Sequence, residues 1–125
     1  MASQFEEVRK FETGATRSSQ DGKLEYRRFL SSTVLRRYAE FMHKNRVQPD
    51  GSMRNPDNWK LGIPKDSYMD SLGRHFMEVW LLHDGNTVTN EKGEDVDLQT
   101  ALCAIMFNVT GYLHELLKEN TDGKR

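Results

Sequence analysis

The sequence has a single cysteine and no long apolar run, and each shortage excludes a class of protein. Cys103 has no second thiol, so neither an internal disulfide nor a CxxC metal or redox site can form. It lies in the apolar segment 101–106, which predicts a small core residue. No apolar stretch approaches the length of a membrane span, and the N-terminus lacks the charged and apolar regions of a signal peptide. We therefore expect a cytoplasmic protein without a membrane partner.

An excess of positive charge is also lacking. The chain carries 18 basic and 19 acidic residues, a net charge of -1, so it has no field that would hold a nucleic acid. It has no Walker-type phosphate loop, no GxSxG elbow and no HExxH zinc spacing, which excludes three large enzyme classes.

A length of 125 residues predicts a single domain over residues 1–125.

What is present is mainly helical periodicity. Residues 1–31 mix Gly, Ser, Thr and charges and predict an irregular arm with turns at Thr13-Gly14 and Asp21-Gly22. Apolar spacing predicts a helical core over residues 32–118. Its three helices would begin at Ser32, near Asp66 and after Asp97, the first ending near Asn45 and the second near His83. Residues 119–125 are expected to form a flexible tail.

All three prolines lie between the first two predicted helices. Residues 46–65 hold them together with two glycines and several Asn and Asp residues, so this stretch predicts a long loop. Such a loop is either a lid or binding loop or a packed irregular crossover, and both interpretations stay open.

The pattern predicts an all-α fold. The last helix carries a long apolar stripe and a second stripe of small side chains that lets another helix approach closely: Ala101, Ala104, Asn108 and Gly111. Three amphipathic helices leave much apolar surface on so short a chain. A symmetric oligomer that completes a helical bundle would cover it.

Three carboxylates and one histidine could carry chemistry. His75 and Glu78 are neighbours on one helix face and could bind a metal or move protons, or they could be a core histidine held by a carboxylate. Glu40 is either a metal ligand or part of a solvated ion-pair surface. Asp97 could cap the last helix, ligate a hard cation, or do both.

Other side chains could contact a nucleotide. Asn58 and Trp59 could hydrogen-bond and stack on a purine base, or Trp59 could pin the loop to the core. The candidate phosphate contacts, each of which could equally be an ordinary surface charge, are Arg17, Lys23, Lys60 and Arg74.

A set of segments in fixed order carries a family resemblance: TGATRSSQDGKLEY, LRRYAEFMHKNR, DNWKLGIP, SLGRHFMEVWLLHDG and DLQTALCAIMFNVTGYLHEL. Over residues 13–117 the chain resembles phage proteins described as dATP/dGTP diphosphohydrolases, which are related to the all-α MazG pyrophosphohydrolases. The resemblance implies a helical dimer or tetramer that hydrolyses nucleoside triphosphates, here purine dNTPs, to a monophosphate and pyrophosphate.

The resemblance also implies a magnesium site, or manganese in its place, with Glu40, Glu78 and Asp97 as metal ligands. Glu78 and His75 would be the catalytic pair, with His75 orienting a ligand or water. The sequence departs from the MazG pattern, because the EExxE cluster is absent and the ExxD of the last helix is reduced to Asp97 followed by Thr100.

Two alternatives follow from the thin acidic cluster and the apolar stripes. The chain could be a catalytically inert phage protein that sequesters a nucleotide or nucleotide signal, because phosphate contacts and stacking do not require a metal cluster. It could also be a helical interaction module whose apolar stripe binds a protein partner.

Overall fold

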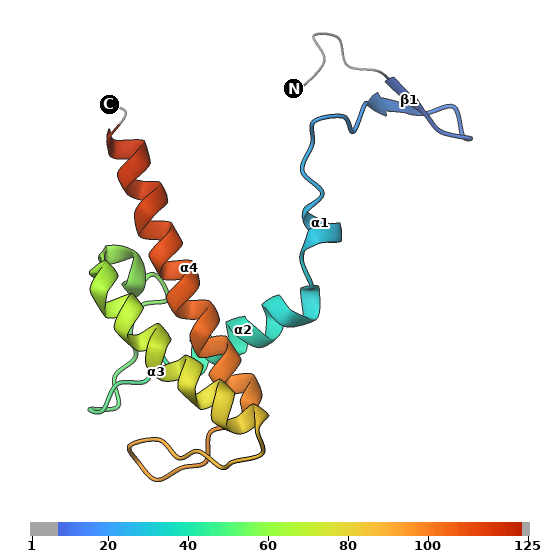
Figure 1. Ribbon diagram of the computed structural model, residues 1–125. Helices are drawn as coiled ribbons and strands as arrows, with labels where there is room; N and C mark the ends of the chain where they lie inside the picture. The colour runs from blue at the N-terminus through green and yellow to red at the C-terminus, as the bar shows by residue number, and fades with distance from the viewer. Residues whose placement is uncertain (1–7, 124–125) are drawn as a thin grey trace. The chain divides into compact units, whose positions relative to one another are not determined.

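The computed structural model describes residues 8–123 and is mostly helical, as the periodicity predicts. The chain divides into two compact units, the first ending at Ser32 and the second beginning at Thr33 (Figure 1). The boundary falls one residue after the predicted arm. Each unit is described by itself.

The first unit contains a small β-hairpin, so the all-α prediction is wrong for this part of the chain. Strands β1 (Val8–Lys10) and β2 (Thr16–Ser18) pair antiparallel, with Arg9 opposite Arg17. The predicted turn at Thr13-Gly14 joins them, and Gly14 adopts a φ of 92° that suits glycine. Strands of three residues are too short to show an alternating pattern, which is why the sequence did not reveal them.

The rest of the first unit contains the second predicted turn and one turn of helix. Lys23 N donates to Gln20 O at 3.1 Å across the turn at Asp21-Gly22. Helix α1 spans only Tyr26–Phe29 and buries none of its residues.

The second unit contains the three predicted helices. They are α2 (Ser32–Lys44), α3 (Lys65–His83) and α4 (Leu98–Gly123), and their starts lie within one residue of the predicted positions. Asp97 precedes α4, and its Oδ1 accepts a hydrogen bond from Thr100 N at 2.6 Å, the arrangement of a helix N-cap.

The C-terminal end of α4 differs from the predicted tail. The helix continues to Gly123, and Lys65 Nζ at the start of α3 lies 2.8 Å from Glu119 Oε1. This ion pair and the spacing of Glu115 and Lys118, whose charged atoms are 3.2 Å apart, favour continued helix beyond residue 118. The last two predicted tail residues, 124 and 125, lie outside the described part of the chain.

The long connection between α2 and α3 is ordered locally. An isolated bridge pairs Val47 with Met53 around a turn in which Gly51 has a φ of 86°. A single 3₁₀ turn, η1 (Asn58–Leu61), follows before α3. The loop therefore folds back on itself rather than crossing as an extended strand.

Close packing of α3 on α4 forms the core (Figure 1). The predicted small-residue stripe of α4 faces inward, since Ala101, Ala104 and Asn108 are all buried. Tyr68 of α3 is 1% exposed and lies directly on Gly111, where a Cβ would overlap the phenol ring. Glycine is therefore required at this crossing.

Few large apolar side chains are buried in this unit. Among the described side chains of this unit, the buried apolar residues besides Tyr68 are the small Ala101, Ala104 and Cys103, which confirms the prediction for the cysteine. Larger side chains on α3 such as Phe76 and Trp80 are more than half exposed. In the part of the chain that the structure describes, no helix is long and apolar enough to cross a membrane.

Candidate functional site

A cavity of about 960 Å³ lies in the second unit, between α2, the loop that follows it, α3 and α4. Its size suits a ligand as large as a nucleotide. Four of the residues that the sequence singles out line it: Asn58, Trp59, His75 and Glu78. They come from η1 and α3, and are brought together because the loop returns along the side of the helix pair.

His75 and Glu78 form a direct pair on α3. His75 Nδ1 lies 2.5 Å from Glu78 Oε1, and the side chains are 33% and 23% exposed. A carboxylate on Nδ1 favours the tautomer with the proton on that nitrogen and leaves Nε2 to accept a proton. The pair is thus built as a positioned acid–base group at the wall of a cavity.

Trp59 is held in place by its neighbours. Its ring makes an edge contact with His114 of α4, with centroids 4.8 Å apart, and the Lys60 ammonium lies 5.6 Å from the ring centroid. These contacts agree with the interpretation that Trp59 pins the loop to the core. Because Trp59 and Asn58 also line the cavity, they remain available to a ligand.

The other two predicted metal ligands do not join Glu78. Glu40 is exposed on α2 and is outside the cavity lining. Asp97 is also outside the lining and is engaged as the cap of α4. The backbone and side-chain hydrogen bonds from Thr100 lower the pKa of the Asp97 carboxyl, and the Arg37 and Lys44 charges lower it further.

The arrangement does not fit a magnesium ion held by the protein. Among the described side chains of residues 8–120, no three His, Cys, Asp or Glu residues gather as a metal-binding group. Glu78 is the one acidic residue among the described side chains of the cavity lining. Magnesium requires six oxygen ligands and binds proteins through one or two carboxylates together with substrate phosphates. We therefore assign no chemical step to a protein-held ion.

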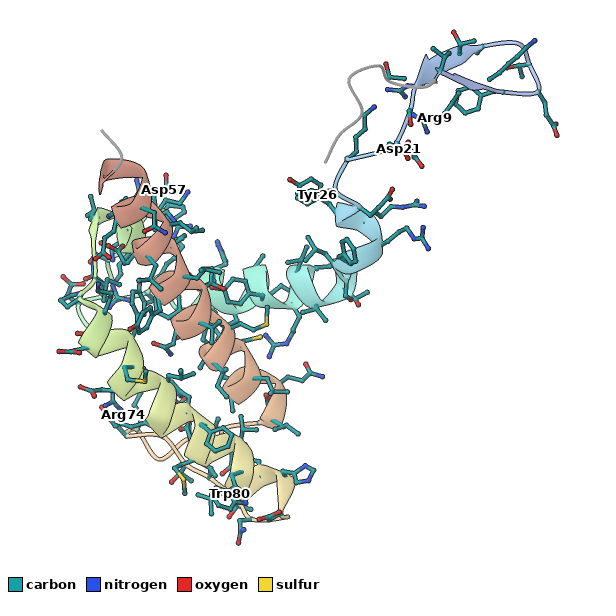
Figure 2. The ribbon with its side chains drawn as sticks, turned by 45° about the horizontal axis from the view of Figure 1, so that its top comes forward. Arg9, Asp21, Tyr26, Asp57, Arg74 and Trp80 are labelled. Carbon is teal, nitrogen blue, oxygen red and sulfur yellow. The ribbon has the colours of Figure 1, made fainter. Side chains whose placement is uncertain are left out.

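Of the four predicted phosphate contacts, Lys60 and Arg74 belong to the second unit, and neither lines the cavity. Arg17 and Lys23 belong to the first unit, which is described separately. Lys60 Nζ lies 3.4 Å from Asp57 Oδ1 and is outside the cavity lining. Arg74 projects from α3 as an exposed side chain that does not line the cavity either (Figure 2).

Sequence reasoning missed the basic side chains that do line the cavity. His43 near the end of α2 and Arg46 and Arg54 of the loop all face it. Arg46 Nε donates to Arg54 O at 2.8 Å, and Arg54 N donates to Arg46 O at 2.8 Å. The usable signal was two arginines on either side of Asp50-Gly51, because such a dipeptide favours a turn and a turn brings its flanks together.

Asn108 was recognised only as a small packing residue. It is 3% exposed, lines the cavity and donates from Nδ2 to Ala104 O of its own helix at 2.8 Å. This bond uses the carboxamide nitrogen and turns the carboxamide oxygen away from the Ala104 carbonyl. A lone carboxamide inside an apolar helix was the available signal, since buried polar atoms normally have partners.

Aromatic side chains of α2 complete the lining. Tyr38 and Phe41 stack with centroids 6.4 Å apart, and both line the cavity. Burial raises the pKa of the Tyr38 hydroxyl, and its hydrogen bond with Thr110 opposes this rise. The cavity therefore combines aromatic surface with hydrogen-bonding and cationic groups.

No protein-family model, curated protein or solved structure matches this chain.

Proposed function

We propose that the cavity binds a nucleoside triphosphate, preferentially a purine deoxynucleotide, and that the protein hydrolyses it to the monophosphate and pyrophosphate. The observation that carries the proposal is the His75–Glu78 pair at 2.5 Å, on the wall of a cavity that also contains stacked aromatic rings and guanidinium groups. The family resemblance supports the choice of substrate and bond. A cytoplasmic location is part of the proposal.

The base end of the ligand would use the aromatic and amide groups. Tyr38, Phe41 and Trp59 offer apolar ring surface to a heterocycle, and stacking on such rings tolerates either purine. The carboxamide oxygen of Asn108 would accept a hydrogen bond from an N–H group of the base. Asn58, at the start of η1, would add a second amide.

The chemical step would use His75 as the base. Glu78 holds the imidazole through Nδ1, so Nε2 takes a proton from the water that attacks the α-phosphorus. The bond from that phosphorus to the bridging oxygen breaks, and pyrophosphate leaves with the electron pair. Magnesium, or manganese, enters only as the counter-ion that accompanies the triphosphate.

Product analysis of variants tests the proposal. The purified protein is incubated with each NTP and dNTP plus magnesium, and the products are resolved by chromatography. Glu78→Gln and His75→Gln should each lower turnover by about 100-fold or more, because a positioned acid–base group contributes that much. Asp70→Asn, an exposed carboxylate on the same helix, is the matched control. Full turnover by Glu78→Gln would contradict the proposal.

Binding without hydrolysis is a second candidate. Glu78 is the one carboxylate among the described residues that line the cavity, and this small number of acidic groups favours binding without hydrolysis. In that case a bound nucleotide would be recovered chemically unchanged, and magnesium chelation would leave the affinity nearly constant.

We also propose that the protein forms a MazG-like helical bundle by self-association. An apolar recess of about 410 Å³ on the second unit is lined by side chains of α3 and α4, among them Phe76, Trp80, Leu98 and Leu102, all exposed to solvent by 38% or more. Patches of this kind mark interaction sites. A dimer or tetramer seen by sedimentation would support the proposal, and a monomer at high concentration would favour the interaction module.

A further inference from the structure

One wall of the cavity is basic, and it comes from the end of α2 and the loop that follows. The basic wall consists of His43, Arg46 and Arg54, which line the cavity from the end of α2 and from the folded loop. Arg46 Nη1 lies 3.5 Å from His43 Nδ1, so at least two of the three groups are adjacent.

Backbone carbonyls orient both guanidinium groups. Arg46 Nε donates to Arg54 O at 2.8 Å, and Arg54 Nη1 donates to Asn45 O at 3.0 Å. Each guanidinium carries five N–H donors in a rigid fork, so most of its donors remain for a ligand. The bonds to the backbone reduce the side-chain entropy that binding would otherwise cost.

Neither guanidinium is neutralised within the described chain. Among the described side chains of residues 8–120, no carboxylate lies within ion-pair distance of Arg46 or Arg54. The nearest acid in sequence, Asp50, is turned to Ser52, whose N and Oγ donate to Asp50 Oδ1 at 2.9 and 2.6 Å. Two oriented cations without a counter-charge, on a cavity wall, are suited to a polyanion.

We infer that the basic wall is the subsite for the oligophosphate end of the ligand, in place of Lys60 and Arg74, the two predicted phosphate contacts of the second unit. This inference rests on the proposed function for the identity of the ligand. Because the wall comes from α2 and its loop while the His75–Glu78 pair comes from α3, a bound oligophosphate would bridge the two sides of the cavity.

Calorimetry with inorganic tripolyphosphate tests the subsite without a base or a bond cleavage. The wild-type chain should bind this probe, and Arg54→Ala should weaken binding about tenfold, as expected for the loss of a charge-assisted hydrogen bond. Arg46→Lys should also weaken it, since an ammonium cannot donate to Arg54 O and to a phosphate as a fork. Arg36→Ala, an exposed arginine of α2 outside the lining, should bind like wild type.

The outcomes separate this inference from the proposed hydrolysis. Unaltered melting temperatures would show that weaker binding by the variants is not unfolding. Equal tripolyphosphate affinity for wild type and Arg54→Ala, or no binding by wild type, would overturn the subsite even if nucleotides are hydrolysed. Tripolyphosphate binding that depends on Arg54, in a protein that leaves every nucleotide intact, would support the subsite and refute the hydrolase.

Discussion

The two long faces of the α3–α4 pair use opposite kinds of side chain. On the inner face, Tyr68 lies on Gly111 next to buried alanines, and the backbones approach closely. On the outer face, Phe76 and Trp80 expose 53% and 54% of their surface beside an apolar recess. Apart from Tyr68, the same helices thus bury small residues and leave several large apolar ones in solvent.

This difference indicates where the stability of the isolated chain comes from. Packing around small residues depends on shape, so it tolerates little added volume. The large apolar side chains contribute little in the monomer and would contribute fully only when covered. Substitutions on the inner face should therefore change the stability of the isolated chain more than substitutions on the outer face. Effects on the outer face should depend on protein concentration.

The largest effect is expected at Gly111. A side chain there overlaps the Tyr68 ring, so Gly111→Val should destabilise the fold by about 2–4 kcal/mol, as overpacking and displacement of a buried aromatic do. Urea unfolding followed by circular dichroism measures it. Gly73→Ala on α3 is the control, because a Cβ added there would meet nothing within 4 Å, and it should stabilise by about 0.5–1 kcal/mol. Equal changes in the free energy of unfolding for Gly111→Val and Gly73→Ala would refute the close contact between Tyr68 and Gly111.

The outer face should matter for association. The double variant Phe76→Asp with Trp80→Asp should sediment as a monomer, because charges on a covered apolar face oppose its burial. The melting temperature of the wild type should rise with protein concentration and that of the variant should not. A concentration-independent melting temperature in both proteins would show that no second copy covers this face.

Asn108 lies on the inner face but also lines the cavity, so it should affect ligand binding more than folding. Asn108→Leu removes the carboxamide oxygen and the bond to Ala104 O together, and such a replacement of similar shape is nearly neutral for stability. The affinity for dATP or dGTP, measured by calorimetry without magnesium, should fall about tenfold. Unchanged affinity would exclude contact with the base.

The smallest effect is expected at the start of α4. Asp97→Ala should lower the free energy of unfolding by about 1 kcal/mol, the usual contribution of an N-cap. Asp97→Asn should keep most of that stabilisation, because asparagine is also a good N-cap residue. The folded-state pKa of Asp97 is lowered from 3.8, so the folded chain binds fewer protons there than the unfolded chain. This contribution is present above about pH 4 and is lost as the pH falls through the folded pKa. Urea unfolding between pH 5 and pH 2 should show less acid sensitivity in Asp97→Asn than in wild type.

Helical periodicity was a sufficient guide to most of the fold. Helices of 13 residues or more repeat their pattern several times, so α2, α3 and the start of α4 could be placed almost to the residue, and Asp97 could be recognised as a cap. The hairpin of the first unit could not, because two strands of three residues offer no period.

The candidate site was harder to predict because it depends on distant contacts. His75 and Glu78 are paired by helix geometry alone, so their spacing was informative. Arg54 and Asn108 line the same cavity because the loop after α2 folds back on itself. No local sequence pattern encodes that tertiary arrangement. Glu40 and Asp97 have the right chemistry, and the tertiary arrangement leaves them outside the lining.

One guanidinium joins α2 to the first turn of α4. Arg37 Nε donates to Gln99 Oε1 at 2.9 Å, and Arg37 Nη2 donates to Thr100 Oγ1 at 3.3 Å, both neutral acceptors. Bonds to neutral groups respond weakly to ionic strength, whereas attraction between guanidinium groups and a polyanion is screened. If the basic wall binds an oligophosphate as proposed, added salt should therefore weaken that binding while the Arg37 bonds between α2 and α4 persist.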